Sequence, residues 1–498
     1  MNYIEFTVFL LPEIVLLVTA LAVIGIDCAR RGKAATGAGG TLASASLCAA
    51  GILVAALIIL IMPQEGRIAG GMLVLDPLTR LFKLVLLAMT LVAVLMLMET
   101  RPVRHVGENF AVMLFAAIGM MLVVGTEELL VLFIGLELTG ISLYVLVGFA
   151  RSDIRSAEAA LKYFLFGSVS AAFLLFGLSL IYGFSGSTEL GEIGVAMQAG
   201  GMEPLLAVGL VMTLVGFGFK VAAVPFHLWA PDVYQGAPAP AAALVASASK
   251  VAGFFILAKV LLLGFAGAEG GAAWGGFQPG WVPLIGVMAA LSMVVGNLAA
   301  LVQNRVRRLL AYSGIGHAGF MLIALMAATP AALASVLFYV VIYGLTTLGA
   351  FGVVTVVLRA REGDRLSDFA GMSRQAPLLS FSMLIFFVSL AGLPPLAGFF
   401  GKFYLFTSAM GAQAAPGGQP GMLWLVLLAL VMSAISLYYY LLVLKQIFFV
   451  EAAEGTPVIR ASKTGTWTCS ILAAATIVLG CYPGILLGPI RLAVGAAF

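Results

Sequence analysis

The chain is a series of long apolar runs that are separated by short polar stretches. Each run has roughly 20 residues, the length that an α-helix needs to cross the hydrocarbon core of a bilayer. Fourteen such runs predict an all-α polytopic membrane protein with about fourteen transmembrane helices and both termini on one side. The predicted spans are residues 5–26, 38–62, 73–98, 109–125, 128–149, 158–183, 203–229, 237–266, 281–302, 308–327, 331–358, 377–408, 421–449 and 465–488.

Two of the predicted spans contain proline in their interior. Span seven carries Pro225 in the segment FKVAAVPFHLWAPD, and span twelve carries Pro394 and Pro395 in SLAGLPPLAGFFGKF. Proline removes a backbone donor and clashes with the preceding helical turn. We therefore expect helices seven and twelve to be broken.

The two broken spans occupy equivalent places in the chain. Each is the fourth of five spans, in a first block of helices 4–8 (residues 108–270) and a second block of helices 9–13 (residues 280–450). A block of five helices enters the membrane from the opposite side at its second occurrence, so the sequence predicts two inverted repeats, as in transporters. Residues 1–107 add helices one to three and residues 460–498 add helix fourteen, all in one membrane domain.

Composition supports this interpretation. The 498 residues are 62% hydrophobic and only 10% charged, whereas about a quarter of an ordinary soluble domain is charged. This excludes a soluble globular enzyme and a disordered protein. The 26 Lys and Arg residues are scattered among loops without a basic face, which argues against nucleic-acid binding. The N-terminus MNYIEF has no positively charged segment, so the first apolar run is predicted to be a helix and not a cleaved signal peptide.

Basic residues cluster in alternate loops, which predicts the orientation of the chain. The opposite loops hold only Arg67 and carry acids, namely Glu127, Glu128, Glu189 and Glu192. The positive-inside rule then places both termini outside the cytoplasm. The seventeen clustered basic residues are Arg30, Arg31, Lys33, Arg101, Arg104, Arg151, Arg155, Lys162, Arg305, Arg307, Arg308, Arg359, Arg361, Arg365, Arg374, Arg460 and Lys463.

Glu137 falls at the middle of the fifth span, in LFIGLELTGISLY. An ionised carboxylate at that depth costs at least about 2.5 kcal/mol, so it needs a partner or water. Lys220 is the expected partner, because it belongs to a broken helix and no other acidic side chain lies deep in spans four to eight. Pairing favours the charged form of each group and burial disfavours it, so making and breaking this pair would move a proton. A structural salt bridge between two helices is the alternative.

Three more lysines within apolar spans are candidates for proton transfer. Lys250, in ASASKVAGFF, has no acidic residue on its own helix and suits a relay. Lys402 lies beyond the break in span twelve, where the alternative is a side chain that snorkels to the membrane interface. Lys259 lies nine residues after Lys250, about 13.5 Å along a regular helix, and either joins the relay or reaches an interface. The predicted series at mid-depth is Glu137, Lys220, Lys250 and Lys402.

Two histidines lie at positions suited to proton transfer. His227, in VPFHLWAPD, would either pass protons on or satisfy backbone groups that Pro225 frees. His317, in YSGIGHAGF, would bridge the two blocks as a relay or serve as a polar packing residue. The same stretch holds a GxGxxG match in residues 314–319. No strand precedes it, so close helix packing explains it better than dinucleotide binding.

The sequence predicts no redox or metal centre on this chain. Its cysteines form no CxxC pair, and its three histidines lie far apart. Any redox cofactor is therefore expected on another chain. The residues concerned are Cys28, Cys48, Cys469, Cys481, His105, His227 and His317.

Three segments carry a resemblance to a known family: FKVAAVPFHLWAPDVYQGAPAPAAALVASASKVAGF, LELTGISLYVLVGF and SAEAALKYFLFGS. They closely resemble the subunit N family of bacterial NADH-quinone oxidoreductase, or respiratory complex I, and the likeness spans essentially the whole chain. It is most specific at PFHLWAPDVYQGAP, because sister subunits M and L and the Mrp antiporter subunits typically place different residues after the PxH core.

The resemblance implies an antiporter-like fold of fourteen helices, with two inverted repeats and discontinuous helices seven and twelve. By matching motif positions, Glu137 would be the helix-five glutamate and Lys220 its helix-seven partner. Lys250 would be the central lysine of helix eight, and Lys402 the helix-twelve residue near the outward exit. Lysine at 402 also argues against subunit M, which usually carries glutamate there.

The resemblance also implies a function. The chain would supply one proton channel of the membrane arm of a proton-translocating enzyme, without a catalytic redox centre of its own. NADH, FMN, iron–sulfur clusters and quinone are expected on partner subunits. The expected partners are the other membrane-arm subunits, including the other antiporter-like subunits, and lipids, but no nucleic acid. The expected location is the bacterial cytoplasmic (inner) membrane, with both termini on the periplasmic or outer side.

Two other functions fit the same pattern. A subunit of an Mrp-type cation/proton antiporter would work without redox chemistry, and sodium-dependent proton exchange without NADH or quinone would favour it. An architectural subunit would use buried ion pairs only to fix helix packing, and neutralising the four charges would leave pumping stoichiometry unchanged. The architectural function ranks last, because so many charges at mid-depth are costly.

Overall fold

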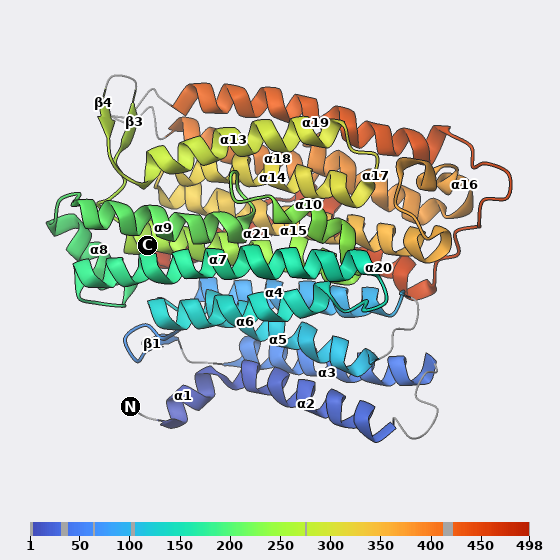
Figure 1. The fold of residues 1–498 in the computed structure, drawn as a ribbon, viewed down its shortest axis with the longest axis horizontal. Coiled ribbons are helices and arrows are strands. Elements are labelled where there is room, and N and C mark those ends of the chain that lie inside the picture. The colour runs from blue at the N-terminus through green and yellow to red at the C-terminus, as the bar shows by residue number, and fades with distance from the viewer. Residues whose placement is uncertain are drawn as a thin grey trace.

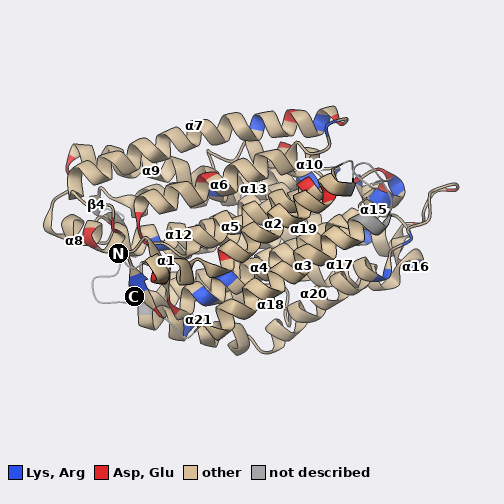
Figure 2. Ribbon diagram, turned by 90° about the horizontal axis from the view of Figure 1, so that it is seen from below, with Lys and Arg blue, Asp and Glu red and all other residues tan. Residues whose placement is uncertain are grey.

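The computed structural model describes residues 3–30, 38–62, 65–100, 105–273, 276–411 and 422–497. Figure 1 shows a bundle in which most helices run along one long axis. Two antiparallel β-hairpins lie at one end, which we call the hairpin end: β1 (Gly66–Ile68) with β2 (Leu73–Leu75), and β3 (Gly271–Ala273) with β4 (Gly276–Gln278). Both ends of the chain also lie at the hairpin end (Figures 1 and 2).

The opposite end of the bundle carries many of the arginines, and we call it the arginine end. Figure 2 shows that charged residues gather near both ends and are sparse between them. At the arginine end the buried carboxylate of Asp364 accepts hydrogen bonds from Arg305 at 2.9 Å and from Arg307 at 3.0 Å. Four of the clustered basic residues, Arg31, Lys33, Arg101 and Arg104, and most of the glycine-rich stretch 411–421 lie outside the described residues.

The helices follow the predicted order of spans. The N-terminal group contains α1 (Tyr3–Phe9), α2 (Leu11–Arg30), α3 (Ala38–Ile61) and α4 (Pro77–Leu97). The first block contains α5 (Val106–Val124), α6 (Leu129–Val147), α7 (Ile154–Ser185), α8 (Leu190–Ala199), α9 (Pro204–Val221), α10 (Trp229–Gly236), α11 (Ala239–Ala246), α12 (Ala248–Lys259) and the π-helix η1 (Val260–Gly264).

The second block and the C-terminal segment complete the bundle. The second block contains α13 (Trp281–Leu301), α14 (Val306–Leu325), α15 (Pro330–Arg361), the 3-10 helix η2 (Leu366–Phe369), α16 (Met372–Gln375), α17 (Pro377–Ala391), α18 (Ala397–Gly411) and α19 (Leu423–Phe449). The C-terminal helices are α20 (Lys463–Cys481) and α21 (Gly484–Ala497).

The helical membrane fold is confirmed. Within the described ranges, thirteen helices are long and apolar enough to cross a membrane, and each overlaps one predicted span. The remaining predicted span, 377–408, forms two shorter helices, α17 and α18. The last predicted span, 465–488, runs past the end of α20, and the chain then forms the separate helix α21. The total of fourteen spans stays a prediction.

The predicted breaks in helices seven and twelve are confirmed. Helix α9 ends at Val221, and Ala222 adopts a left-handed conformation with φ of 57° before α10 begins at Trp229. Helix α17 ends before Gly392, whose φ is 85°, and α18 starts at Ala397. Each break includes proline, as the sequence predicts.

Span eight is also interrupted, which the sequence analysis did not predict. Ser247, with φ of −112° and ψ of −87°, separates α11 from α12. The interruption lies three residues before Lys250. Proline occurs only at the start of α11, so residues 244–250 hold no proline that would have revealed the break.

The first helices of the two blocks run in opposite directions. Helix α5 ends at the hairpin end, where the Gly125 carbonyl accepts a hydrogen bond from the Val74 N–H of β2. Helix α13 begins beside the β3–β4 hairpin, where the Trp281 N–H donates to Ala268 O. Opposite directions are what inverted repeats require, and the repeat itself stays a prediction.

The centre of the molecule lies where the two blocks meet. All residues of α11 and α12 are buried by other helices. Helices α14 and α15, of the second block, are buried along nearly their whole length. Polar side chains on these helices are therefore held in a protein interior, away from lipid.

Candidate functional site

Glu137 and Lys220 line one cavity between α6, α7 and α9. Its volume is about 30 Å³, which is enough to hold water, and Tyr144, Tyr163 and Ser170 also line it. The charges of Glu137 and Lys220 interact across it. Within the described structure no direct ion pair joins them at 4.0 Å or less. The two groups face each other across a gap, and their role as a charge pair that is made and broken stays a prediction.

Lys220 lies in the last turn of α9, immediately before the break. A cation is favoured there, because the carbonyl groups at a helix C-terminus carry partial negative charge. Its side chain also packs against α12, and a Cβ built on Gly253 would lie 3.2 Å from Lys220 Cγ. The glycine thus allows the lysine of helix seven to approach helix eight.

Lys250 is buried on α12 and faces the second block. Its Nζ donates a hydrogen bond to the Gly314 carbonyl of α14 and lies 5.2 Å from the centre of the Tyr343 ring. No described carboxylate forms an ion pair with Lys250. The described contacts of its nitrogen are a carbonyl dipole and an aromatic face.

His317 is buried on α14 of the second block and contacts two tyrosine hydroxyls. Its Nδ1 is 2.8 Å from the hydroxyl of Tyr339 on α15, and its Nε2 is 3.1 Å from that of Tyr440 on α19. These contacts all lie within the second block, so a bridging role of His317 between the two blocks stays a prediction.

Lys402 lies on α18, just after the break in helix twelve. Its Nζ donates to Ala391 O at 3.0 Å and to Ser433 Oγ at 2.8 Å, and it lies 5.2 Å from the centre of the Phe320 ring. The residue is only 4% exposed, which argues against a side chain that snorkels to an interface. Gly392 leaves room for it, since a Cβ there would lie 2.8 Å from Lys402 Cδ.

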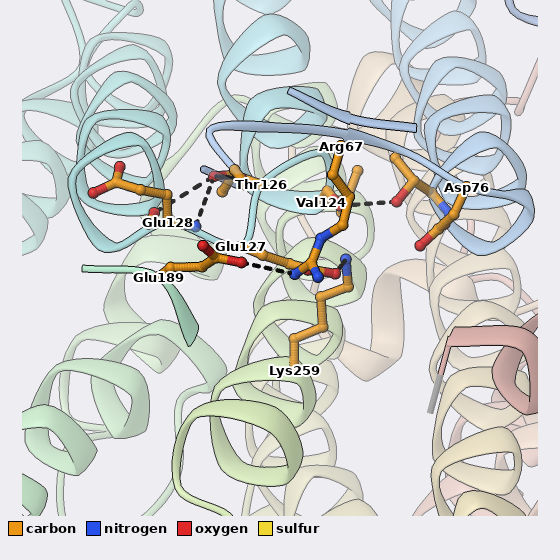
Figure 3. Close-up of polar contacts among 10 residues, drawn as sticks. Arg67, Asp76, Val124, Thr126, Glu127, Glu128, Glu189 and Lys259 are labelled. Carbon is orange, nitrogen blue, oxygen red and sulfur yellow. Dashed lines mark hydrogen bonds and ion pairs between the residues drawn. The ribbon is translucent and has the colours of Figure 1, made fainter. Parts of the chain in front are cut away.

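Figure 3 shows where Lys259 lies, at the hairpin end of α12. The ammonium is buried and forms an ion pair with Glu127 Oε1 at 2.9 Å. Glu127 in turn contacts Arg67, which lies 3.6 Å from Glu189. The sequence analysis assigned these acids to a loop and did not pair them with Lys259.

His227 lies in the unwound segment between α9 and α10. The residue is 9% exposed, and its Nδ1 has no hydrogen-bond partner among the described residues. A role for His227 in proton transfer stays a prediction.

The GxGxxG match in residues 314–319 serves helix packing. A Cβ on Gly319 would lie 2.8 Å from Ala289 O of α13, and one on Gly316 would lie 2.7 Å from Asn297 Nδ2. The motif starts inside α14 and follows no strand. Its interpretation as a close helix contact is confirmed.

Comparison with known proteins identifies the family. Residues 126–447 match the family described as NADH:quinone oxidoreductase/Mrp antiporter, TM. The chain belongs to this family. NADH-quinone oxidoreductase subunit N 2 of Acidobacterium capsulatum is 47% identical over 501 aligned residues, which cover 98% of this chain and 99% of the relative. The resemblance to the subunit N family is therefore confirmed.

Solved structures of the NADH:quinone oxidoreductase/Mrp antiporter family share the fold. A chain in respiratory complex I from Thermus thermophilus has a TM-score of 0.77 and 34% identity, covering 96% of this chain and 98% of that chain. A chain in the Mrp complex from a Dietzia species has the same TM-score with 19% identity, covering 97% of each chain. At that identity the Mrp likeness shows the fold alone.

The sequence analysis missed several polar residues of this family member. Tyr339 and Tyr343 lie four residues apart on α15, and this spacing puts both on one helix face. Glu13 on α2 and Lys83 on α4 form a buried ion pair at 2.7 Å, outside the residues that match the family. Glu13 and Lys83 are charged residues within predicted spans, and this signal could have revealed them from the sequence.

Proposed function

We propose that this chain is a proton-translocating membrane-arm subunit of an NADH-quinone oxidoreductase. Protons would move through the buried Glu and Lys residues, driven by redox chemistry on other subunits. One observation carries the proposal: a row of buried or half-buried polar side chains lies beside the two helix breaks and on the helices between them, namely Glu137, Lys220, Lys250, His317 and Lys402. Such charges are costly in a membrane protein and mark ion pathways.

The gap between Glu137 and Lys220 supplies the switch. When the two groups approach, the ammonium of Lys220 is stabilised by the carboxylate, and when they separate, the buried lysine holds its proton less well. Lys220 packs against Gly253 of α12, the helix that carries Lys250. Through this contact, a change at Glu137 would alter the affinity of Lys250 for its proton.

The second block would receive the proton through His317. Imidazole gains a proton at one ring nitrogen and gives one up at the other, and here each nitrogen already contacts a tyrosine hydroxyl. Lys402 then governs exchange with the outer side, because it is the last buried cation of the row. His227, beside the break in helix seven, would serve uptake into the first block.

The orientation and assembly form part of the same proposal. The arginine end faces the cytoplasm under the positive-inside rule, and the hairpin end with both termini faces the periplasm or outer side. NADH, FMN, iron–sulfur clusters and quinone belong to partner subunits, and the chain contacts other membrane-arm subunits and lipid. Two findings support this assignment: 47% identity to a subunit N and 34% identity to a chain of a complex I structure.

Glu137→Gln tests the proposal. In assembled complex reconstituted into liposomes, we expect fewer protons translocated per NADH oxidised, because the neutral amide no longer controls Lys220. Glu158→Gln is the matched control, since Glu158 is an exposed glutamate on α7 whose ion pair with Lys162 lies outside the row. If the assembled Glu137→Gln complex translocates as many protons per NADH as the parent complex, the proposed role of the row in proton translocation is refuted.

A native gel tests membership of the complex. Mildly solubilised membranes would be separated and stained for NADH dehydrogenase activity. Co-migration of the chain with a large NADH-oxidising assembly is the expected result. A smaller particle without that activity, together with sodium-dependent proton exchange in vesicles, would instead establish the Mrp-type function.

A further inference from the structure

Helix α12 carries a second buried lysine, Lys259. A series of side-chain contacts connects it to the protein surface at the hairpin end. Lys259 is 1% exposed, and its ammonium contacts the Glu127 carboxylate at 2.9 Å. The guanidinium of Arg67 contacts the other oxygen of that carboxylate and reaches Glu189 at 3.6 Å. The four side chains therefore form a row that begins at a buried ammonium (Figure 3).

The other end of this row reaches solvent. The Arg67 side chain is 50% exposed and that of Glu189 is 26% exposed, whereas that of Glu127 is 7% exposed. Glu127 thus separates a buried lysine from an accessible arginine. A proton on Glu127 would be a short step from water at the hairpin end.

The backbone holds Glu127 firmly at this place. Its N–H donates to Gly71 O of the turn between β1 and β2, and its carbonyl accepts from Leu190 N–H at the start of α8, both at 2.9 Å. Lys259 is likewise fixed, because it ends α12 and the π-helix η1 follows at once. Short π-helical segments are frequent at functional sites.

The neighbouring acids are engaged elsewhere. The Glu128 carboxylate caps α6 by accepting from Val131 N–H at 2.9 Å, and Asp76 caps α4 by accepting from Thr79 N–H at 2.6 Å. Asp76 also interacts with Lys259 electrostatically. Of the described carboxylates near Lys259, only that of Glu127 forms an ion pair with it.

We propose that Lys259 and Glu127 form a proton-release site at the hairpin end of the first block, separate from Lys402. This inference rests on the proposed function and adds a second route to the outer side. Lys250 lies nine residues earlier on the same helix, about 13.5 Å along its axis, so both lysines belong to one helix of the channel.

The release step is a simple proton transfer. An Nζ–H bond of the Lys259 ammonium breaks and an Oε–H bond forms on Glu127, which leaves a neutral amine and a neutral carboxylic acid. Arg67 then shifts its contact towards Glu189. The acid gives its proton to water and becomes a carboxylate again, which Arg67 rebinds, while Lys259 takes up the next proton from the channel.

A lysine-to-arginine exchange separates this role from a structural one. Arginine keeps the positive charge and the ion pair with Glu127, but it does not give up its proton in proteins. If Lys259 only holds the β1–β2 hairpin against α12, Lys259→Arg should leave proton translocation unchanged. If Lys259 transfers protons, the substitution should lower it. Lys162→Arg is the matched control, because Lys162 forms an ion pair with Asp232 at 2.7 Å outside this row.

The experiment measures protons released per NADH oxidised by assembled complex in liposomes. We expect Lys259→Arg and the isosteric Glu127→Gln to assemble and to lower this ratio, while Lys162→Arg keeps the parent value. The double variant Lys259→Arg/Glu137→Gln should lower this ratio no further than the more severe of the two single variants does, because both residues act on one channel.

The outcomes separate this inference from the function on which it rests. If Lys259→Arg or Glu127→Gln releases as many protons per NADH as the parent complex while Glu137→Gln releases fewer, the release site is refuted. The proposed proton channel is then retained. If Glu137→Gln also keeps the parent ratio, the proposed function fails first. If neither Lys259→Arg nor Glu127→Gln assembles, the row of side chains serves to stabilise the structure, and the inference is overturned.

Discussion

Lys83 of α4 and Glu13 of α2 form an ion pair at 2.7 Å in which both side chains are almost completely buried. Apart from Lys83, the Glu13 carboxylate has no hydrogen-bond partner among the described residues. The pair joins two helices of the N-terminal group, which precedes the residues that match the family. Because each buried charge depends on the other, the pair helps to fix the position of α2 relative to α4.

Breaking this pair from one side should be more harmful than removing it altogether. Lys83→Met leaves an unpaired buried carboxylate, which costs about 3–5 kcal/mol. The double variant Glu13→Gln/Lys83→Met should recover part of that loss, with a coupling of about 0.5–3 kcal/mol. The measurements are the amount of assembled complex in membranes and its aggregation temperature in detergent. A double variant no better than Lys83→Met would show that the two charges act independently.

His317→Gln should lower proton translocation without preventing assembly. Glutamine can still accept from or donate to the hydroxyls of Tyr339 and Tyr440, but it cannot carry a proton between them. We expect fewer protons per NADH in assembled complex. Tyr440→Phe is the comparison, since losing a hydrogen bond costs about 1 kcal/mol and would reveal a role in packing. An unchanged ratio in His317→Gln would assign His317 to packing alone.

Much of the fold could be predicted because its signals are local. Apolar runs long enough to span a bilayer mark the helices, and proline at 225 and 395 marks two breaks, since its effect on a helix is confined to a few residues. Buried charges such as Glu137 and Lys402 also stand out within apolar sequence. These signals require no knowledge of which helices meet.

The remaining features depend on contacts between distant segments. Lys259 and Glu127 are 132 residues apart, and nothing in either local sequence names the other as its partner. The break at Ser247 has no proline beside it, and the Glu137–Lys220 gap depends on how α6, α7 and α9 pack together. Tertiary packing decides these cases, so the sequence supplied the charged groups but not their pairing.

Gly319→Val should impair assembly, because α13 and α14 touch at this residue. A Cβ there would lie 2.8 Å from the Ala289 carbonyl and 2.9 Å from Met293 N, and backbone atoms cannot move aside easily. Overpacking of this kind costs about 1–3 kcal/mol. Gly183→Val on α7 is the control, because a Cβ at that glycine meets nothing within 4 Å. Equal levels of both variants in the assembled complex would contradict a close contact at Gly319.

Gly392→Ala should impair proton translocation through its contact with Lys402. The glycine has a φ of 85°, so alanine introduces backbone strain of about 1–2 kcal/mol, and its Cβ would meet Lys402 Cδ at 2.8 Å. Gly455→Ala separates the two effects, because Gly455 has a φ of 79° and a Cβ there meets nothing within 4 Å. Both variants should lose similar stability, but only Gly392→Ala should lower the protons moved per NADH. If the two variants translocate protons equally well, the position of Lys402 is not critical, because the backbone strain is matched and only the contact with the lysine differs.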